Sequence, residues 1–405
     1  MGRSKKRGRN PADDLTDDLV VEILSRLPAK SVCRFKCVSK HWCHGLIAHP
    51  DHRSRLPQTL SGFFRSSETR IDDGTKSSPI IDSDDDDDLY ESDHDTEWTI
   101  APNFVSILGK KKEKHAVVSD PALSFLTGYR SVIPKSCSDG LLLCLCWKVA
   151  STTESDYVVC NPATQQWVSV PGNGHRFRTD MRMFLAAAAS GHFHIFALLH
   201  DEDWEWYTED VDIYSSEAGA WSHHESGWAW DTKVSHRGVF HHGMLHLVTI
   251  SSTIVAVNTE GTTWRTIPLL ESMATTYRYS SNGPFIGVSQ ERFHYVSHRR
   301  RDEHTLSVWI LGDGGDDENQ WTYRYSISTT RIFGAKITDL EEYSLVGIHP
   351  ECNTVFFGVK RNRKYVLLSY DMDRGKVRTL GNIRFGGWSY RPYLPYVPSF
   401  SRIVG

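Results

Sequence analysis

The sequence predicts a multidomain chain in which a small all-α domain of about three helices precedes an all-β propeller, and three observations support this prediction. Three short apolar-periodic segments lie within residues 13–52. Beyond about residue 58, short β-rich runs alternate with turn residues. A loose repeat of a hydrophobic strand, a polar turn and an anchor residue, usually tryptophan, indicates five propeller blades, and the remaining hydrophobic segments are expected to form a sixth. The expected boundaries are residues 13–57 for the helical domain and 58–405 for the propeller.

The first apolar segment has the start and stop signals of a helix. Thr16 suits an N-cap, Asp17 and Asp18 occupy the first turn, where the helix dipole favours negative charge, and Pro28 ends the helix. The three apolar stripes consist of Leu19, Val20, Ile23, Leu24 and Leu27, then Val32, Phe35 and Val38, and finally Trp42, Leu46 and Ile47 after a Ser39 cap. Domains below about 40 residues usually need a disulfide, a metal or a partner. This apolar surplus therefore indicates a partner protein.

The anchors of the β repeat predict one blade each. They are Trp167, Trp221, Trp264, Trp321 and Val377, separated by 54, 43, 57 and 56 residues. A four-stranded blade takes roughly 40–50 residues. We expect the turn before each anchor to pair the two outer strands of a blade, and the tryptophan to pack against the neighbouring sheet.

The remaining hydrophobic runs complete the expected ring. Those upstream of the anchors, expected as inner strands, cover residues 136–147, 193–199, 238–248, 292–298 and 353–359. The sixth blade is expected from residues 62–64, 103–109 and 396–400, with the two chain ends pairing to close the ring. The alternative, a pair of β-sandwich domains, would show neither the period nor the tryptophan after each turn.

Composition is that of an ordinary soluble protein, with a formal net charge of −4 that does not suggest bulk binding to nucleic acid or an anionic membrane. No signal peptide is recognisable, and the longest apolar run, at residues 183–189, is far too short for a membrane span. The eight cysteines are then expected as reduced thiols, in the cytoplasm, the nucleus or both.

Two segments are expected to be disordered. Residues 1–12 form a basic tail that is either a nuclear localisation signal or a solvated end. Residues 66–97 are dense in Asp and Ser and poor in apolar residues, so this acidic insertion should be a flexible loop.

The order and spacing of residues 15–42 closely resemble the F-box, the adaptor-binding module of Skp–cullin–F-box ubiquitin ligases. The matching stretches are Leu15-Thr16, Asp18-Leu19, Glu22-Ile23-Leu24, Leu27-Pro28, Lys30-Ser31-Val32, residues 34–40 and Trp42. Thr16 stands where many members carry Pro, and an N-cap accepts either. The resemblance implies binding to a Skp-family adaptor and, through it, to a cullin. The adaptor-binding residues expected from it are Leu15, Leu19, Ile23, Leu24, Leu27, Pro28, Val32, Cys33, Arg34, Phe35, Val38 and Trp42.

The rest of the chain resembles the kelch-like propeller domain that follows the F-box in a large plant F-box family. Residues 56–64, 119–126 and 136–147 carry this looser resemblance. It implies that the chain is a non-catalytic substrate receptor that binds an unknown target protein and needs no cofactor.

The aromatic loops of the propeller are the candidate target site, since Trp and Tyr dominate interface hot spots. These candidates are Trp204, Trp206, Tyr207, Trp228 and Trp230. The alternative is that these tryptophans pack between blades.

Four other functions are alternatives to the receptor role. The histidines at 192, 194, 236, 241, 242 and 246 invite a metal site, but no HExxH or Cys-x-x-Cys motif accompanies them, so no metal is predicted. Some kelch-type propellers are copper oxidases, which require a converged Tyr, His and Cys set. Direct nucleic-acid binding is disfavoured because the basic clusters at 110–112 and 299–301 are each followed by acids. An F-box scaffold that binds its adaptor without a role in ubiquitination stays open.

Overall fold

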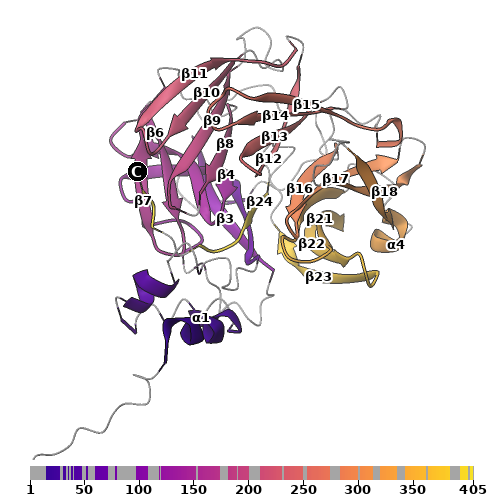
Figure 1. Cartoon of the computed structure of the whole chain (residues 1–405), viewed down its shortest axis with the longest axis horizontal. Coiled ribbons are helices and arrows are strands. Elements are labelled where there is room, and N and C mark those ends of the chain that lie inside the picture. The colour runs from indigo at the N-terminus through magenta and orange to yellow at the C-terminus, as the bar shows by residue number, and fades with distance from the viewer. Residues whose placement is uncertain are drawn as a thin grey trace, which may run out of the picture.

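Six antiparallel sheets of four strands each follow one another around the computed structural model (Figure 1). The structure describes residues 15–27, 31–32, 35, 38–39, 41–47, 52, 60–71, 78–79, 97–107, 118, 120–151, 154–173, 181–188, 190–199, 210–229, 232–249, 253–273, 283–299, 302–312, 320–334, 343–361, 364–383, 393–399 and 402–404. The predicted six-bladed propeller is confirmed.

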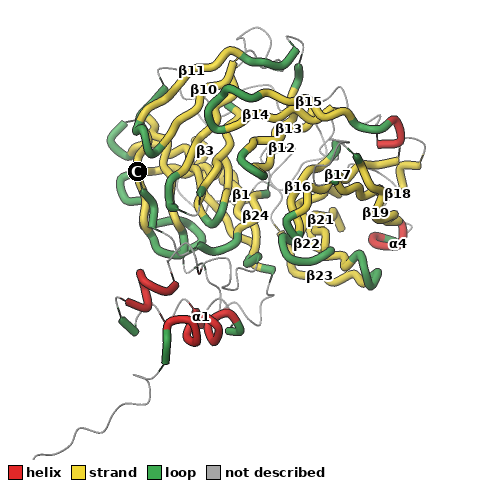
Figure 2. The backbone as a smooth tube through the Cα atoms, in the orientation of Figure 1, coloured by secondary structure: helices red, strands yellow, loops and turns green. Residues whose placement is uncertain are grey.

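Each sheet is one blade, and strands dominate the described backbone (Figure 2). Blade 1 contains β1 (Gly62–Ile71), β2 (Ser78–Pro79), β3 (Glu97–Ser106) and β24 (Leu394–Tyr396). Blade 2 contains β4 (Tyr129–Ser138), β5 (Leu141–Lys148), β6 (Ser155–Asn161) and β7 (Gln166–Val170). Blade 3 contains β8 (Arg182–Ala187), β9 (Phe193–Leu199), β10 (Asp210–Ser215) and β11 (Ala220–Glu225).

The second half of the ring repeats this pattern. Blade 4 contains β12 (Val234–His241), β13 (Met244–Thr249), β14 (Thr253–Asn258) and β15 (Trp264–Pro268). Blade 5 contains β16 (Phe285–Ser289), β17 (Arg292–Arg299), β18 (Asp302–Leu311) and β19 (Trp321–Ser328). Blade 6 contains β20 (Tyr343–Ile348), β21 (Thr354–Arg361), β22 (Lys364–Asp371) and β23 (Lys376–Ile383). The helical elements are α1 (Asp17–Ser25), η2 (His41–Ile47), η4 (Glu271–Met273) and α4 (Thr329–Phe333).

The hydrophobic core lies between the blades, because each of the six seams between neighbouring sheets buries its own apolar cluster. Representative pairs, taken around the ring from the seam of blades 1 and 2, are Phe64 with Leu142, Tyr157 with Ile195, Phe196 with Leu245, Ile254 with Tyr295, Val308 with Phe357, and Phe356 with Phe63. Both faces of a blade are therefore buried, which explains why its middle strands are continuous apolar runs.

The two ends of the propeller sequence close the ring, as predicted. Near the C-terminus, β24 pairs with β1, aligning Leu394 with Phe64 and Tyr396 with Gly62. The fully buried Tyr396 ring then packs edge-on against Phe64, with ring centroids 5.2 Å apart.

In blades 2 and 6, the side chain of the last residue of the third strand stabilises the turn before the anchor. The Asn161 side chain accepts hydrogen bonds from the backbone N–H groups of Ala163 and Thr164, and the Asp371 side chain accepts from those of Asp373 and Arg374. Such local bonds favour Asn and Asp at turn starts. In blade 6, Gly375 then takes a φ of +62°, which an L side chain rarely adopts.

Two of the anchor tryptophans join neighbouring blades, as expected of them. Trp221 donates its indole N–H to the carbonyl of Pro171, after β7, at 2.7 Å. Trp321 makes the same bond to Pro268, at the end of β15, at 3.0 Å. We call this contact the indole clasp. It links the outer strand of one blade to the end of the preceding outer strand.

Replacing Trp321 with Phe should remove this hydrogen bond and keep most of the apolar contact. We expect a loss of about 0.5–1.5 kcal/mol in the free energy of unfolding, measured by urea denaturation. Trp264→Phe is the matched control, because its indole bonds to Gly261 within its own turn at 3.0 Å and not to another blade. Equal losses in the two variants would show that the clasp adds nothing of its own.

The runs expected as inner strands correspond to the second strands β5, β9, β13, β17 and β21, which lie inside the two outer strands of each blade as predicted. Two other sequence expectations are corrected by the structure. The acidic insertion is shorter than residues 66–97, since 66–71 belong to β1, 78–79 form β2 and Glu97 opens β3. Finally, Thr16 occupies the N-cap of α1, but its side chain makes no capping hydrogen bond.

Candidate partner-binding surfaces

The N-terminal helical residues have a small core of their own. The buried side chains are Val20, Val21, Leu24, Val32, Leu46 and Ile47, with Leu27, Phe35 and Trp42 packed against them. The Phe35 and Trp42 rings lie 5.6 Å apart. Ser39 caps η2 by accepting the Trp42 backbone N–H at 3.1 Å, and His41 Nε2 lies 2.9 Å from Asp17 Oδ1 at the start of α1. These contacts fix the orientation of α1 relative to η2.

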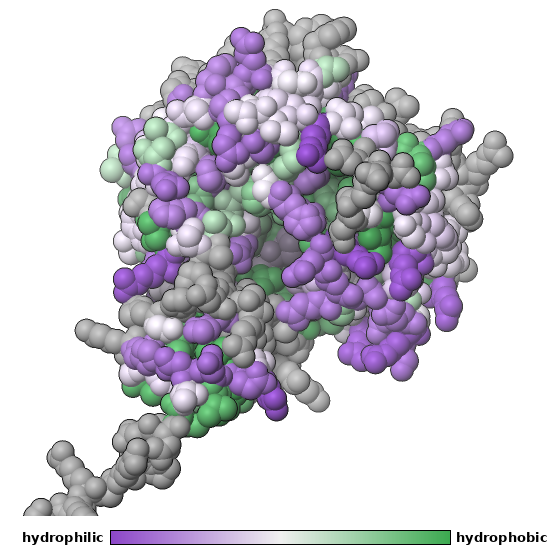
Figure 3. Space-filling view, in the orientation of Figure 1, coloured by the Kyte–Doolittle hydropathy of each residue, from purple (hydrophilic) through white to green (hydrophobic). Residues whose placement is uncertain are grey.

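The opposite side of α1 exposes an apolar stripe. Leu15, Leu19 and Ile23 are 44%, 52% and 50% exposed, and Val38 is 57% exposed. Leu15, Leu19 and Ile23 follow one another at four-residue intervals, so they line one face near α1. Hydrophobic residues gather on the surface over α1 in Figure 3. We call Leu15, Leu19, Ile23 and Val38 the α1 stripe. Exposed apolar side chains gathered on one face are typical of protein-binding surfaces.

The expected adaptor-binding residues therefore divide between two roles. Leu15, Leu19, Ile23 and Val38 face solvent, whereas Leu24 and Val32 are buried, and Leu27, Phe35 and Trp42 are partly buried in the helical core. Leu24 and Val32 can affect a partner only by holding the exposed residues in place, whereas Leu27, Phe35 and Trp42 keep part of their surface exposed. Pro28, Cys33 and Arg34 lie outside the described residues.

Among the expected target-binding residues, only Trp228 lies in the described part of the chain. It is 7% exposed and packs edge-on against Trp264, with ring centroids 4.8 Å apart. Its indole N–H points to the carbonyl of Ala256 at 3.4 Å. The hydrophobic cluster that contains Trp228 is built from residues of blades 3 and 4. Trp228 therefore packs between blades, which was the alternative to a target-binding role. Trp204, Trp206, Tyr207 and Trp230 lie outside the described residues.

The histidines of blade 4 act as packing and hydrogen-bonding residues. The His241 and His242 rings stack with their centroids 3.8 Å apart, next to the turn at Gly243. The His246 ring packs on Phe293, with ring centroids 4.9 Å apart. His246 Nδ1 lies 3.1 Å from the Met244 carbonyl. Within the residues that the structure describes, no three His, Cys, Asp or Glu side chains gather closely enough to hold a metal ion.

Burial lowers the pKa of His246 to about 4. Since the unfolded value is near 6.5, the unfolded chain binds more protons as the pH falls below 6.5, and His246 destabilises the fold progressively down to about pH 4. At pH 5 this linkage costs on the order of 2 kcal/mol relative to pH 7.5. We expect His246→Asn to lose less stability between pH 7.5 and 5 than the wild type, as measured by urea unfolding. An unchanged pH dependence would contradict this assignment.

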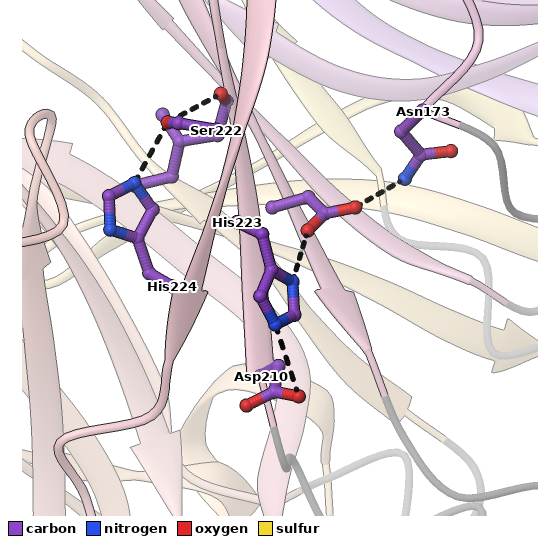
Figure 4. A network of polar contacts seen from close by, with 7 residues as sticks. Asn173, Asp210, Ser222, His223 and His224 are labelled. Carbon is purple, nitrogen blue, oxygen red and sulfur yellow. Dashed lines mark hydrogen bonds and ion pairs between the residues drawn. The ribbon is translucent and has the colours of Figure 1, made fainter.

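A polar network joins blades 2 and 3 (Figure 4), and no motif in the sequence predicted it. The buried Asp212 carboxylate accepts from His223 Nδ1 and from Asn173 Nδ2, both at 2.9 Å. Asp210 lies 3.6 Å from His223 Nε2. The hydrogen bond to Asp212, followed by the charges of Asp210 and Glu225, raises the pKa of His223. This network therefore stabilises the seam most at low pH, and its contribution fades as the pH rises through that raised pKa.

Comparison with known families matches most of the chain. Residues 13–44 match the F-box domain, which covers the α1 stripe and most of the helical core. Residues 112–383 match the model described as F-box protein At3g26010-like, beta-propeller. The chain therefore belongs to the F-box proteins with a propeller of the At3g26010-like family. The kelch-like character expected from the sequence stays a prediction.

Individual relatives agree with this family. F-box protein At5g07610 of Arabidopsis thaliana is 28% identical over 240 residues, which is 54% of this chain and 48% of that protein. F-box protein At3g49450 of the same plant is 26% identical, over 39% of this chain and 34% of its own length. F-box protein At2g15640 is 73% identical over 33 residues, 8% of either chain. This chain thus spans about half the length of At5g07610 and a third of At3g49450.

In the described part of the chain, no helix is both long enough and apolar enough to cross a membrane.

Proposed function

We propose that the chain is the substrate-recognition subunit of a Skp–cullin–F-box ubiquitin ligase, without catalytic residues of its own. The F-box binds a Skp-family adaptor and, through it, a cullin, while the propeller binds the target protein. The observation that carries this proposal is the α1 stripe, an exposed apolar surface on a domain that matches the F-box.

The energetics of the stripe support a stable partner. Burying a Leu or Ile side chain contributes about 1.5–3 kcal/mol. Leu15, Leu19 and Ile23 are each about half exposed, so covering them removes a large part of that area from water. Six four-stranded sheets with a buried apolar cluster between each neighbouring pair give the propeller a rigid frame for target-binding loops.

Catalysis in such an assembly comes from proximity. A receptor that holds a target beside a ubiquitin-loaded enzyme raises the effective concentration of the target's lysines. The receptor then needs two binding surfaces and no reactive group. The identity of the target follows from the propeller surface and not from the F-box.

The test is affinity purification of the full chain from plant cells, with and without a proteasome inhibitor, followed by mass spectrometry. We expect adaptor and cullin in both samples and target proteins enriched under inhibition. The variant carrying Leu19→Ala and Ile23→Ala is the control, and it should lose the adaptor and cullin while keeping the targets. Recovery of the adaptor without any inhibitor-dependent protein would instead indicate a scaffold, and absence of the adaptor would overturn the proposal.

A further inference from the structure

The seam between blades 5 and 6 carries a group of exposed basic side chains on its outer side. We call them the basic seam, and they come from β19, α4 and the β22–β23 turn. Hydrophilic residues cover the surface over β22 and β23 in Figure 3. The members of the basic seam are Arg324, Arg331 and Arg374, all of them exposed.

The three side chains converge where the two blades meet. The Arg331 guanidinium lies against the β22–β23 turn. Its Nη2 is 3.3 Å from the position that a Cβ atom on Gly375 would occupy. Arg324 lies over the Tyr325 ring, 5.5 Å from its centroid. Tyr325 in turn donates its hydroxyl to Asp373 in the same turn, at 2.6 Å. Blade 5 thus contributes Arg324 and Arg331 to the surface beside Arg374 of blade 6.

The carboxylates at this seam are already engaged. Asp373 accepts from Tyr325 and from Asn353 Nδ2, the latter at 2.9 Å, and these hydrogen bonds, helped by the nearby Arg324 and Arg374, lower its pKa. Asp371 lies 3.6 Å from Arg374 and also accepts from the backbone of its own turn. Within the described residues, Arg324 and Arg331 form no ion pair with a carboxylate. The seam therefore keeps a surplus of positive charge.

The same seam lacks the indole clasp. At the position of Trp221 and Trp321, blade 6 has Val377, which is 38% exposed. A valine has no donor for the preceding outer strand, so Val377 cannot form the clasp. Its apolar side chain is left in reach of solvent near Arg374.

We propose that the basic seam binds an extended, Asp/Glu-rich segment of the target protein. This inference rests on the proposed function and assigns a place and a chemical class to its target site. A guanidinium group pairs with a carboxylate through two parallel hydrogen bonds, which an isolated point charge cannot form. Arg324, Arg331 and Arg374 are therefore well suited to bind carboxylates. Val377 offers contact for one apolar side chain between the acids.

The experiment measures binding of a fluorescent 14-residue Asp/Glu-rich peptide with one central Leu to the purified full chain in complex with a Skp-family adaptor. We expect binding that weakens steeply with salt. Replacing Arg324, Arg331 and Arg374 together with Gln should weaken it by roughly tenfold or more. The matched control replaces Arg130, Arg265 and Arg292 with Gln. These three are exposed on β4, β15 and β17, so the change in net charge is the same. The control should bind the peptide as the wild type does.

Several results would overturn the inference. They are no peptide binding by the wild type, equal weakening by the control, or equally tight binding of a single-stranded DNA of the same charge. Binding that appears only after deletion of residues 80–96 would show that the chain's own acidic segment occupies the seam, which also overturns a target site there. Adaptor binding is measured in parallel: its loss in the wild type would contradict the proposed function, whereas loss of peptide binding alone contradicts only this inference.

Discussion

Replacing both Leu19 and Ile23 with Ala is expected to weaken binding to a Skp-family adaptor by roughly 100-fold, while the propeller stays folded. Each of these side chains is about half exposed on α1, so both are free to enter a partner's pocket. Interface anchors of this kind cost about 2 kcal/mol or more each when truncated, and every 1.4 kcal/mol is tenfold in affinity. Biolayer interferometry with immobilised adaptor measures the change.

The control for this prediction lies on the same helix. Asp18→Ala removes an exposed carboxylate from the first turn of α1 without removing apolar area, and should change adaptor affinity by less than about threefold. Leu24→Ala tests the other role, since Leu24 is 1% exposed and its truncation should unfold the helical core. Wild-type affinity in the double variant, or equal losses in the double variant and Asp18→Ala, would contradict the assignment of the stripe.

Tyr396→Ala is expected to destabilise the propeller by about 3–5 kcal/mol, the usual range for removing a large buried aromatic side chain. Tyr396 is fully buried and contacts Phe64 and Phe104, with ring centroids 5.2 and 6.0 Å away. It also belongs to β24, the strand that closes the ring against β1. The loss therefore falls on the one blade that is built from both ends of the propeller sequence. Guanidinium unfolding followed by tryptophan fluorescence measures it.

Val404→Ala is the matched control for Tyr396→Ala. Val404 lies eight residues further along the chain and is 39% exposed, so its truncation should cost less than about 0.5 kcal/mol. A loss below about 1 kcal/mol for Tyr396→Ala would show that the ring does not depend on β24.

The sequence could predict the parts of this fold that repeat. The spacing of the anchors reflects one four-stranded sheet per copy, and Asn161 and Asp371 open equivalent turns through the same side-chain-to-backbone hydrogen bonds. Closure by the chain ends was predictable because Phe63 and Phe64 lay in a hydrophobic run without a blade of its own. The exact order of strands within a blade was not, because two adjacent buried strands have the same apolar pattern.

The surfaces were harder to predict than the fold. Periodicity identified the apolar residues of α1 but could not say that Leu19 and Ile23 are exposed while Leu24 is buried, since this depends on where Val32, Leu46 and Ile47 pack. Trp228 looked like a surface aromatic because its neighbours are polar, yet its ring fills the seam beside Trp264. The basic seam draws on β19, α4 and the β22–β23 turn, which are separated in sequence and meet only in the folded ring.

Isothermal titration of the purified full chain with a purified Skp-family adaptor tests the central claim most directly. The account predicts a one-to-one complex with a Kd below about 1 μM, as expected for an interface built on several buried apolar anchors. Leu19→Ala with Ile23→Ala should abolish the measurable heat. A wild-type chain that is folded by circular dichroism and shows no binding with the adaptor at about 100 μM would contradict the claim that this surface is an adaptor site.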